Sequence, residues 1–206
     1  FNERKNLQQN KINSDFKYKK IWVASSTHKR EEIFCAKTHI ILKKKYKNLI
    51  TIIIPRHINR VKKIISEIKN LNLTIELHSK SKKSLNNIDI YLVDTFGETK
   101  KFFNISSTVF LGGSIVKKGG QNPLEAARYG AKIVHGPNID NFKDIYRLLK
   151  SMKISYKIKT PKNLASLILF KKKYNTGNKI KNIGVKVLKK TIKELDYLIK
   201  NEFKKT

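Results

Sequence analysis

Four short segments hold most of the residues that can bind a charged or sugar-like ligand. Ser25-Ser26-Thr27-His28 combines hydroxyls with an imidazole, and Pro55-Arg56-His57 offers a guanidinium beside a second imidazole. The segment 94–98 contains Asp94 and Glu98 in a chain with only 15 acidic residues, and 112–127 is rich in glycine. Such groups together suit a phosphorylated sugar or a nucleotide, because they can bond both phosphate and hydroxyl oxygens.

Each segment also has a purely structural explanation. A hydroxyl of the first segment can cap a helix that begins near Lys29. Arg56 can be a surface charge before a helix, although an Arg kept in a chain that otherwise uses Lys favours planar recognition of phosphate or a base. The acids of 94–98 can stabilise a helix N-terminus through its dipole. Asn122 and Glu125 have capping-box spacing, in which Glu125 bonds only the Asn122 amide.

The glycine-rich segment makes the most specific prediction. Asn122 fits a helix N-cap and Pro123 the first turn, so the free amides of that turn favour an anion such as a nucleotide phosphate. The glycines at 112, 113, 119 and 120 let a ligand approach the backbone closely. The sequence contains no Walker loop, GxGxxG, Asp-x-Asp or zinc-type His/Cys spacing, so we predict neither a metal nor a cofactor.

Strand-like and helix-like segments alternate along the chain and position these loops. Short apolar runs predict strands at 21–24, 49–54, 73–77, 88–93, 109–111, 132–135 and 154–158. Helical spacing predicts helices at 31–46, 58–68, 97–103, 123–129, 141–150, 164–172 and 183–203. The alternation predicts an α/β fold, a Rossmann-like parallel sheet with helices on both faces. Ligands of such sheets lie beyond the carboxyl ends of the strands, where all four segments fall.

The net charge of +31 has two explanations. Of the 46 Lys and Arg residues only 6 are Arg, which favours codon bias and solvated lysine faces over selection for phosphate binding. The alternative is a basic surface that attracts anionic lipid or nucleic acid. Cys35 is the single cysteine, which excludes an internal disulfide and suits a reducing compartment. No run approaches the ~20 apolar residues of a membrane span.

Together these segments resemble the C-terminal half of the bacterial 3-deoxy-D-manno-octulosonic acid (Kdo) transferases. These are two-domain glycosyltransferases of the GT-B type that transfer Kdo from CMP-Kdo to the lipid A precursor. The matching stretches follow the order of the family over roughly 6–150. They are Trp22-Val23-Ala24-Ser25-Ser26-Thr27-His28 with Glu31-Glu32, Pro55-Arg56-His57, Asp94-Thr95 with Gly97-Glu98, Gly112-Gly113-Ser114, Gly119-Gly120 with Asn122-Pro123-Leu124-Glu125-Ala126-Ala127, and Gly136-Pro137 with Asn141-Phe142.

The resemblance implies a set of residues that bind CMP-Kdo. These are Arg56, His57, Phe96, Gly97, Glu98, Asn122, Pro123, Leu124 and Glu125, with further donor contacts from Ser26, Thr27, His28, Gly113 and Ser114. It also implies an inverting, metal-independent transfer whose catalytic base lies in an N-terminal domain that this chain lacks. The chain would then be the donor-binding part and inactive alone. The implied partners are CMP-Kdo, the lipid A precursor and the anionic cytoplasmic face of the inner membrane, with no specific nucleic acid.

Three departures from the family pattern affect the site. The family's Gly-Asn-Leu-Lys is Lys5-Asn6-Leu7-Gln8 here, so the cation that would stabilise departing charge is absent at Gln8 unless Lys5 or Lys11 replaces it. The family's His before Asn-Pro is Gln121, and its glycine before Glu-Glu is Arg30, which narrows the first loop. The alternative functions are a UDP-sugar-dependent GT-B transferase and a basic nucleic-acid-binding module.

The predicted domain organisation has three parts. Residues 1–20 form a linker from a missing N-terminal acceptor domain, 21–175 the Rossmann-like nucleotide-sugar (donor) domain, and 176–206 a C-terminal helical tail. With 206 residues, 39% of them hydrophobic, the chain can bury one sizeable core. Because it begins with Phe1, we expect it to be part of a longer protein.

Overall fold

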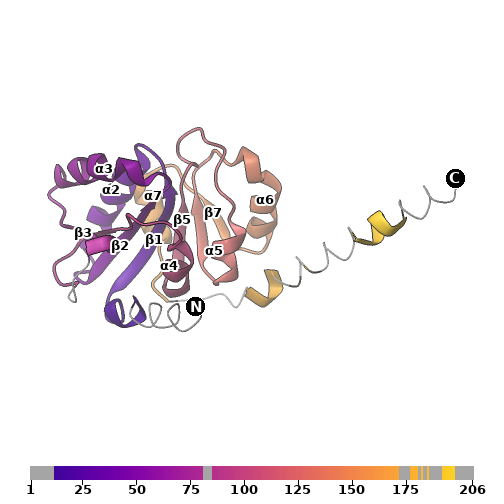
Figure 1. Ribbon diagram of the computed structural model, residues 1–206, viewed down its shortest axis with the longest axis horizontal. Coiled ribbons are helices and arrows are strands. Elements are labelled where there is room, and N and C mark those ends of the chain that lie inside the picture. Colours follow the sequence, from indigo (N-terminus) through magenta and orange to yellow (C-terminus); the bar gives the residue numbers. More distant parts are fainter. Residues whose placement is uncertain are drawn as a thin grey trace.

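The computed structural model describes residues 12–80, 85–171, 177–180, 182, 185 and 192–197. Its centre is a seven-stranded parallel sheet with the strand order β3-β4-β2-β1-β5-β6-β7 (Figure 1). The strands are β1 Lys20–Thr27, β2 Leu49–Pro55, β3 Ile75–Leu77, β4 Ile90–Leu92, β5 Thr108–Leu111, β6 Lys132–His135 and β7 Ser155–Lys157. Each predicted strand is present, and the predicted fold class is confirmed.

Helices connect these strands in the predicted order. They are α2 Glu31–Lys43, α3 Val61–Lys69, α4 Thr99–Ile105, α5 Leu124–Arg128, α6 Lys143–Ser151 and α7 Pro161–Leu167, with 3-10 turns at Ile58–Arg60, His78–Lys80 and Asp140–Phe142. Helix α7 begins three residues earlier than predicted, because the side chain of Thr160 accepts a hydrogen bond from the Asn163 amide and Pro161 fits the first turn.

The two faces of the sheet have separate hydrophobic cores, as expected for buried parallel strands. On one face Trp22 and Phe110 pack against residues of α2, α3 and α7. On the other, Val23 and Val109 pack against residues of α4, α5 and α6. Neighbouring residues of β1 therefore point to opposite cores, and both faces of the central strand are covered by helices.

The winding of the chain reverses at β1. From β1 the chain passes through α2 and α3 to β2, β3 and β4 on one side, and then through α4 to β5 on the other side. In doubly wound sheets a ligand crevice lies at the carboxyl edge where this reversal occurs. Here that point lies between the ends of β1 and β5, whose residues Ser25 and Leu111 are paired.

The described ends of the chain contribute to the core. Within the predicted linker, Ile12 and Phe16 are buried against β1 and its neighbours, and Lys20 already begins β1. Ile180, in the helical segment 177–180, is buried in the same core. The departure at Gln8, with Lys5 and Lys11, lies outside the described residues, as does most of the predicted helix 183–203. The division into a linker, a donor domain and a tail stays a prediction. Among the described helices, none has the length and apolar character needed to cross a membrane.

Candidate functional site

The loops after β1 and β5 touch at the point where the winding reverses. A side chain at Gly112 would place its Cβ 2.3 Å from the carbonyl oxygen of Ser26 and 2.6 Å from Cα of Thr27, so only glycine fits. The register of β1 shifts between Ser25 and Thr27, and Ser26 has a φ of 55°. Strained backbone of this kind persists only where the surroundings fix it, and it is common at functional sites.

Glu31, the first residue of α2, holds these two loops in place. Its carboxylate is fully buried and accepts hydrogen bonds from the backbone amides of Gly113 at 2.7 Å, Ser114 at 3.0 Å, Ile115 at 2.9 Å and His28 at 2.9 Å. Burial raises the pKa of Glu31, and these amide bonds partly offset the effect by favouring the carboxylate. The backbone amides of the loop after β5 form a concavity, and the negatively charged carboxylate of Glu31 occupies it.

Glu32 fixes a third loop through a paired ion contact. Its buried carboxylate accepts two hydrogen bonds from the Arg60 guanidinium, at 2.9 and 3.1 Å. Such bidentate pairs restrict the geometry as well as adding energy. This contact anchors the turn before α3 to the start of α2. Spacing along the sequence gave no indication of the Glu32–Arg60 pair or of the bonds from residues 113–115 to Glu31, since these partners are distant in the chain.

Most of the predicted CMP-Kdo contacts lie at the starts of α4 and α5, whereas Arg56 and His57 follow β2. Glu98 pairs with Lys101 at 2.6 Å and lies 3.7 Å from Nε2 of His78, while Glu125 pairs with Lys100 across the two helices at 3.6 Å. Phe96 is 75% exposed, and Gly97 has a φ of 81° with no atom near the position of a Cβ. The structure therefore places two carboxylates beside an open, glycine-containing surface.

The start of α5 corrects two predictions. The helix begins at Leu124, one residue later than expected, and the Asn122 side chain accepts a hydrogen bond from the Leu124 amide at 3.0 Å. A helix of five residues with one terminal amide already bonded does not support the predicted anion site at its N-terminus. The capping-box explanation is also wrong, because the Glu125 carboxylate pairs with Lys100 instead and is 47% exposed.

Three of the remaining predicted contacts are engaged in the fold. The Ser114 hydroxyl donates to the Leu111 carbonyl and accepts from the Gly136 amide at 2.8 Å, and it is fully buried. Thr27 is also buried, and its carbonyl accepts from the Arg56 amide at 3.0 Å. Asp94 accepts two bonds from Ser79. In this conformation the Ser114 side chain joins two loops, whereas the Thr27 hydroxyl is buried and has no hydrogen-bond partner among the described residues. Arg56 and His57 are exposed beside them.

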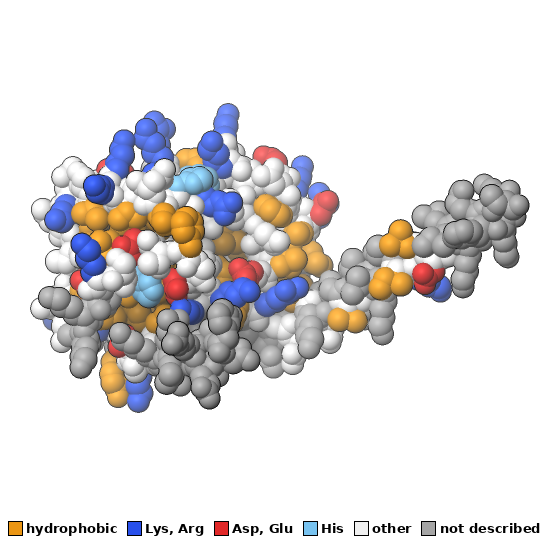
Figure 2. All heavy atoms as spheres, in the orientation of Figure 1, with side chains coloured by type: hydrophobic (Ala, Val, Ile, Leu, Met, Phe, Trp, Pro, Cys, Tyr) orange, Lys and Arg blue, Asp and Glu red, His pale blue; other side chains and the backbone are white. Residues whose placement is uncertain are grey.

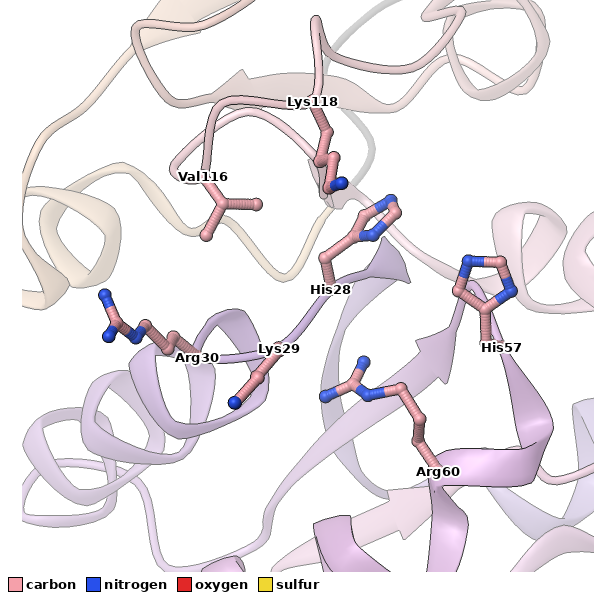
Figure 3. Close-up of a pocket in the computed structure, with 7 residues that line it drawn as sticks. All are labelled: His28, Lys29, Arg30, His57, Arg60, Val116 and Lys118. Atoms are coloured by element: carbon pink, nitrogen blue, oxygen red, sulfur yellow. The ribbon is translucent and has the colours of Figure 1, made fainter.

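A cavity of about 490 Å³ opens above these loops. We call it the basic pocket; it is lined by His28, Lys29, Arg30, His57, Arg60, Val116 and Lys118 (Figure 3). The rings of His28 and His57 are 5.7 Å apart. Burial lowers the pKa of His28, and the nearby positive charges of His57, Lys118, Arg60 and Arg56 lower it further. Among the described residues, no group of acids, His and Cys has a geometry that could hold a metal ion.

The doubly wound parallel sheet, with the loops after β1 and β5 at its point of reversal, identifies the class of domain. It is a Rossmann-like domain of the kind that forms the C-terminal half of GT-B glycosyltransferases. The C-terminal CMP-Kdo binding domain of WaaA from Acinetobacter baumannii has this fold, with a TM-score of 0.72 and 24% identity over 78% of this chain and 84% of that domain.

Sequence comparison finds several Kdo transferases, and also a bifunctional glycosyltransferase/methyltransferase of Fusobacterium nucleatum that is 34% identical over 73% of this chain and 23% of its own length. The 3-deoxy-D-manno-octulosonic acid transferase of Rickettsia bellii is 32% identical over 179 residues, which are 87% of this chain and 43% of that protein. The protein of the same name from Haemophilus influenzae is 35% identical over 129 residues, 63% of this chain and 30% of its own length. No family model matches the chain. These matches confirm the resemblance to the Kdo transferases, of whose length the chain spans less than half.

Proposed function

We propose that this chain is the donor-binding part of a Kdo transferase and binds CMP-Kdo at the carboxyl edge of its sheet. The observation that carries the proposal is the juxtaposition of Glu98 and Glu125 on adjacent helix starts, joined through the Lys100–Glu125 contact. Carboxylates at such positions can accept hydrogen bonds from ribose hydroxyls or an exocyclic amine. Identity of 32% to a Kdo transferase over 87% of the chain supports the same substrate class.

The proposed reaction is an inverting displacement. A hydroxyl of the acceptor attacks the anomeric carbon of Kdo, the bond from that carbon to the phosphate oxygen breaks, and CMP leaves with the electron pair. Arg56 is exposed at the end of β2, where its guanidinium can bond the departing phosphate. The base that takes the hydroxyl proton belongs to a preceding domain, so we expect the chain to bind the donor without turnover. We expect no metal requirement.

Nucleotide binding tests this proposal directly. In titration calorimetry with CMP, UMP and AMP, we expect CMP to bind most tightly, and a chelator to leave its affinity unchanged. Equal affinity for all three would contradict a cytidine-specific donor site. In a parallel titration with UDP, tighter binding of UDP than of CMP would favour the alternative, a transferase that uses a UDP-sugar.

The proposed acceptor is the lipid A precursor, and the proposed location is the cytoplasmic face of the inner membrane. The charge of +31 supports attraction to anionic lipid, at ~1 kcal/mol per Lys close to the surface. Figure 2 shows Lys and Arg side chains scattered over the visible face rather than gathered in one stripe, which favours diffuse contact and disfavours a nucleic-acid module. Co-sedimentation with anionic vesicles should be strong at low salt and lost at high salt. Retention at high salt would contradict a purely electrostatic contact.

A further inference from the structure

The basic pocket shares His28 and His57 with the predicted donor contacts but extends beyond the carboxylates proposed to bind the nucleoside. Its lining comes from the loops that follow β1, β2 and β5 and includes none of the residues 96–98 or 122–125. Figure 3 shows Arg30 and Val116 on one side of the cavity and His57 and Arg60 on the other, with His28 between them. A ligand that reaches both regions therefore presents one group to Glu98 and Glu125 and a different group to this pocket.

The pocket concentrates positive charge without an acid in its lining. Six of its seven lining residues are Lys, Arg or His, and none is Asp or Glu. Two acids at the start of α2 are already engaged: Glu32 with the Arg60 guanidinium and Glu31 with backbone amides. In addition, Nε2 of His28 is buried and has no hydrogen-bond partner among the described residues. This ring nitrogen can donate a hydrogen bond to an oxygen atom of a ligand, and the surrounding cations favour a ligand that carries negative charge.

Arg30 combines a strained backbone with a side chain that lines the pocket. Its φ of 81° lies in the left-handed region that favours glycine, and its side chain lines the pocket. A non-glycine residue in that region costs on the order of a factor of ten in the folding equilibrium. A glycine at this position would relieve the strain but would remove one of the positive charges.

We propose that the basic pocket is an oxyanion-binding subsite that takes a carboxylate or phosphate group of a substrate outside its nucleoside, with Arg30 and Lys118 among its ligands. Both chemistries have a source if the proposed function holds. The transferred sugar is an acid, and the acceptor is a phosphorylated lipid. The existence of the subsite rests on the pocket alone, whereas the identity of its ligand rests on the proposed function.

The test measures anion binding to the full chain in the presence of saturating CMP. Inorganic phosphate, free Kdo and neutral mannose are titrated separately and followed by NMR or calorimetry. We expect at least one anion to bind and mannose not to bind. Tighter binding of Kdo assigns the pocket to the acid group of the donor, and tighter binding of phosphate assigns it to the acceptor. The proposal of a separate subsite is overturned if neither anion binds, or if the anions displace CMP.

Three variants locate the effect. Lys118→Gln should weaken anion binding about tenfold, as expected for loss of a charge-assisted bond. Lys117→Gln should have no effect, because Lys117 is also exposed but does not line the pocket. Arg30→Gly should weaken anion binding while leaving the melting temperature equal or higher. Equal effects of Lys117→Gln and Lys118→Gln would refute the assignment. If CMP fails to bind while anions still bind, the proposed function fails and the subsite stands.

Discussion

At the amino edge of the sheet, Asp89 accepts hydrogen bonds from the side chains of His39, Lys43 and Thr74. At the carboxyl edge, by contrast, the basic pocket is lined by cations and by no Asp or Glu. The amino-edge network also includes Thr51, whose hydroxyl is 2.9 Å from Nδ1 of His39, and the Thr74 amide, which donates to Asp89 at 2.9 Å. It joins α2, β2 and the residues preceding β3 and β4.

The two edges differ in how far their charged side chains find partners within the protein. Burial alone would raise the pKa of Asp89, but its bonds from Lys43 and Thr74 outweigh that effect and lower it. Burial lowers the pKa of His39, partly offset by Asp89. A fully bonded network of this kind contributes to stability and specificity of the fold. At the other edge Arg60 is paired with Glu32, and the exposed cations of the pocket have no acid in its lining, so a ligand can meet them.

Asp89→Ala should produce the largest effect. It removes the acceptor shared by a buried His and a Lys, and breaking such a network costs about 3–5 kcal/mol of unfolding free energy. Urea unfolding measures the loss, and CMP affinity of the remaining folded protein should not change. Asp144→Ala is the matched control, since Asp144 is 89% exposed and pairs only with Arg147. A loss for Asp89→Ala as small as that of the control would contradict the role of the network.

A second prediction concerns His135, which lies at the carboxyl edge but is enclosed like the amino-edge network. Its Nδ1 is 2.7 Å from the Gly136 carbonyl, its ring is 4.4 Å from that of Tyr146, and burial lowers its pKa to about 4. The unfolded chain takes up this proton near pH 6.5, so the stabilisation present above that pH is lost as the pH falls towards 4. The loss should be about 3 kcal/mol.

Unfolding by urea at several pH values between 7 and 4 measures this loss. His135→Gln should reduce the slope of stability against pH relative to the unaltered protein. An unchanged slope in His135→Gln would place the titrating group elsewhere. A reduced slope in His135→Gln would show that the end of β6 is enclosed, although it lies at the same edge as the open loops.

The third prediction separates binding from stability at Glu125. Glu125→Gln should weaken CMP binding by about 2 kcal/mol, because it removes a charge-assisted bond to a ligand hydroxyl. Stability should change by less than about 0.5 kcal/mol, since the carboxylate pairs only with the exposed Lys100. Calorimetry and urea unfolding of the same variant provide both values. A lower melting temperature with unchanged CMP affinity would give Glu125 a structural role.

Local sequence patterns were sufficient to predict the strands and which loops lie at the carboxyl edge. Isoleucine-rich runs such as 49–54 are typical of buried parallel strands, and parallel strands place their following loops at one edge. Most contacts of Glu31, Glu32 and Asp89 were not predictable, because these partners lie 15 to 85 residues away; the bond from the His28 amide to Glu31 is the local exception. The left-handed backbone of Arg30 was missed for the same reason, since only the packed loops impose it.

The smallest expected effect tests the open surface beside Glu98. Gly97→Ala places a methyl group where no protein atom is near, so its only structural cost is the left-handed backbone, about 1 kcal/mol. If CMP lies over this surface, the methyl group also hinders its approach, and CMP affinity should fall roughly fivefold. Asn72→Ala is the counterpart at the amino edge, where φ is 56° and the side chain is exposed. It should cost a similar amount of stability and leave CMP affinity unchanged. If both variants bind CMP like the unaltered protein, the nucleotide does not contact Gly97, and its contacts must be sought closer to Arg56.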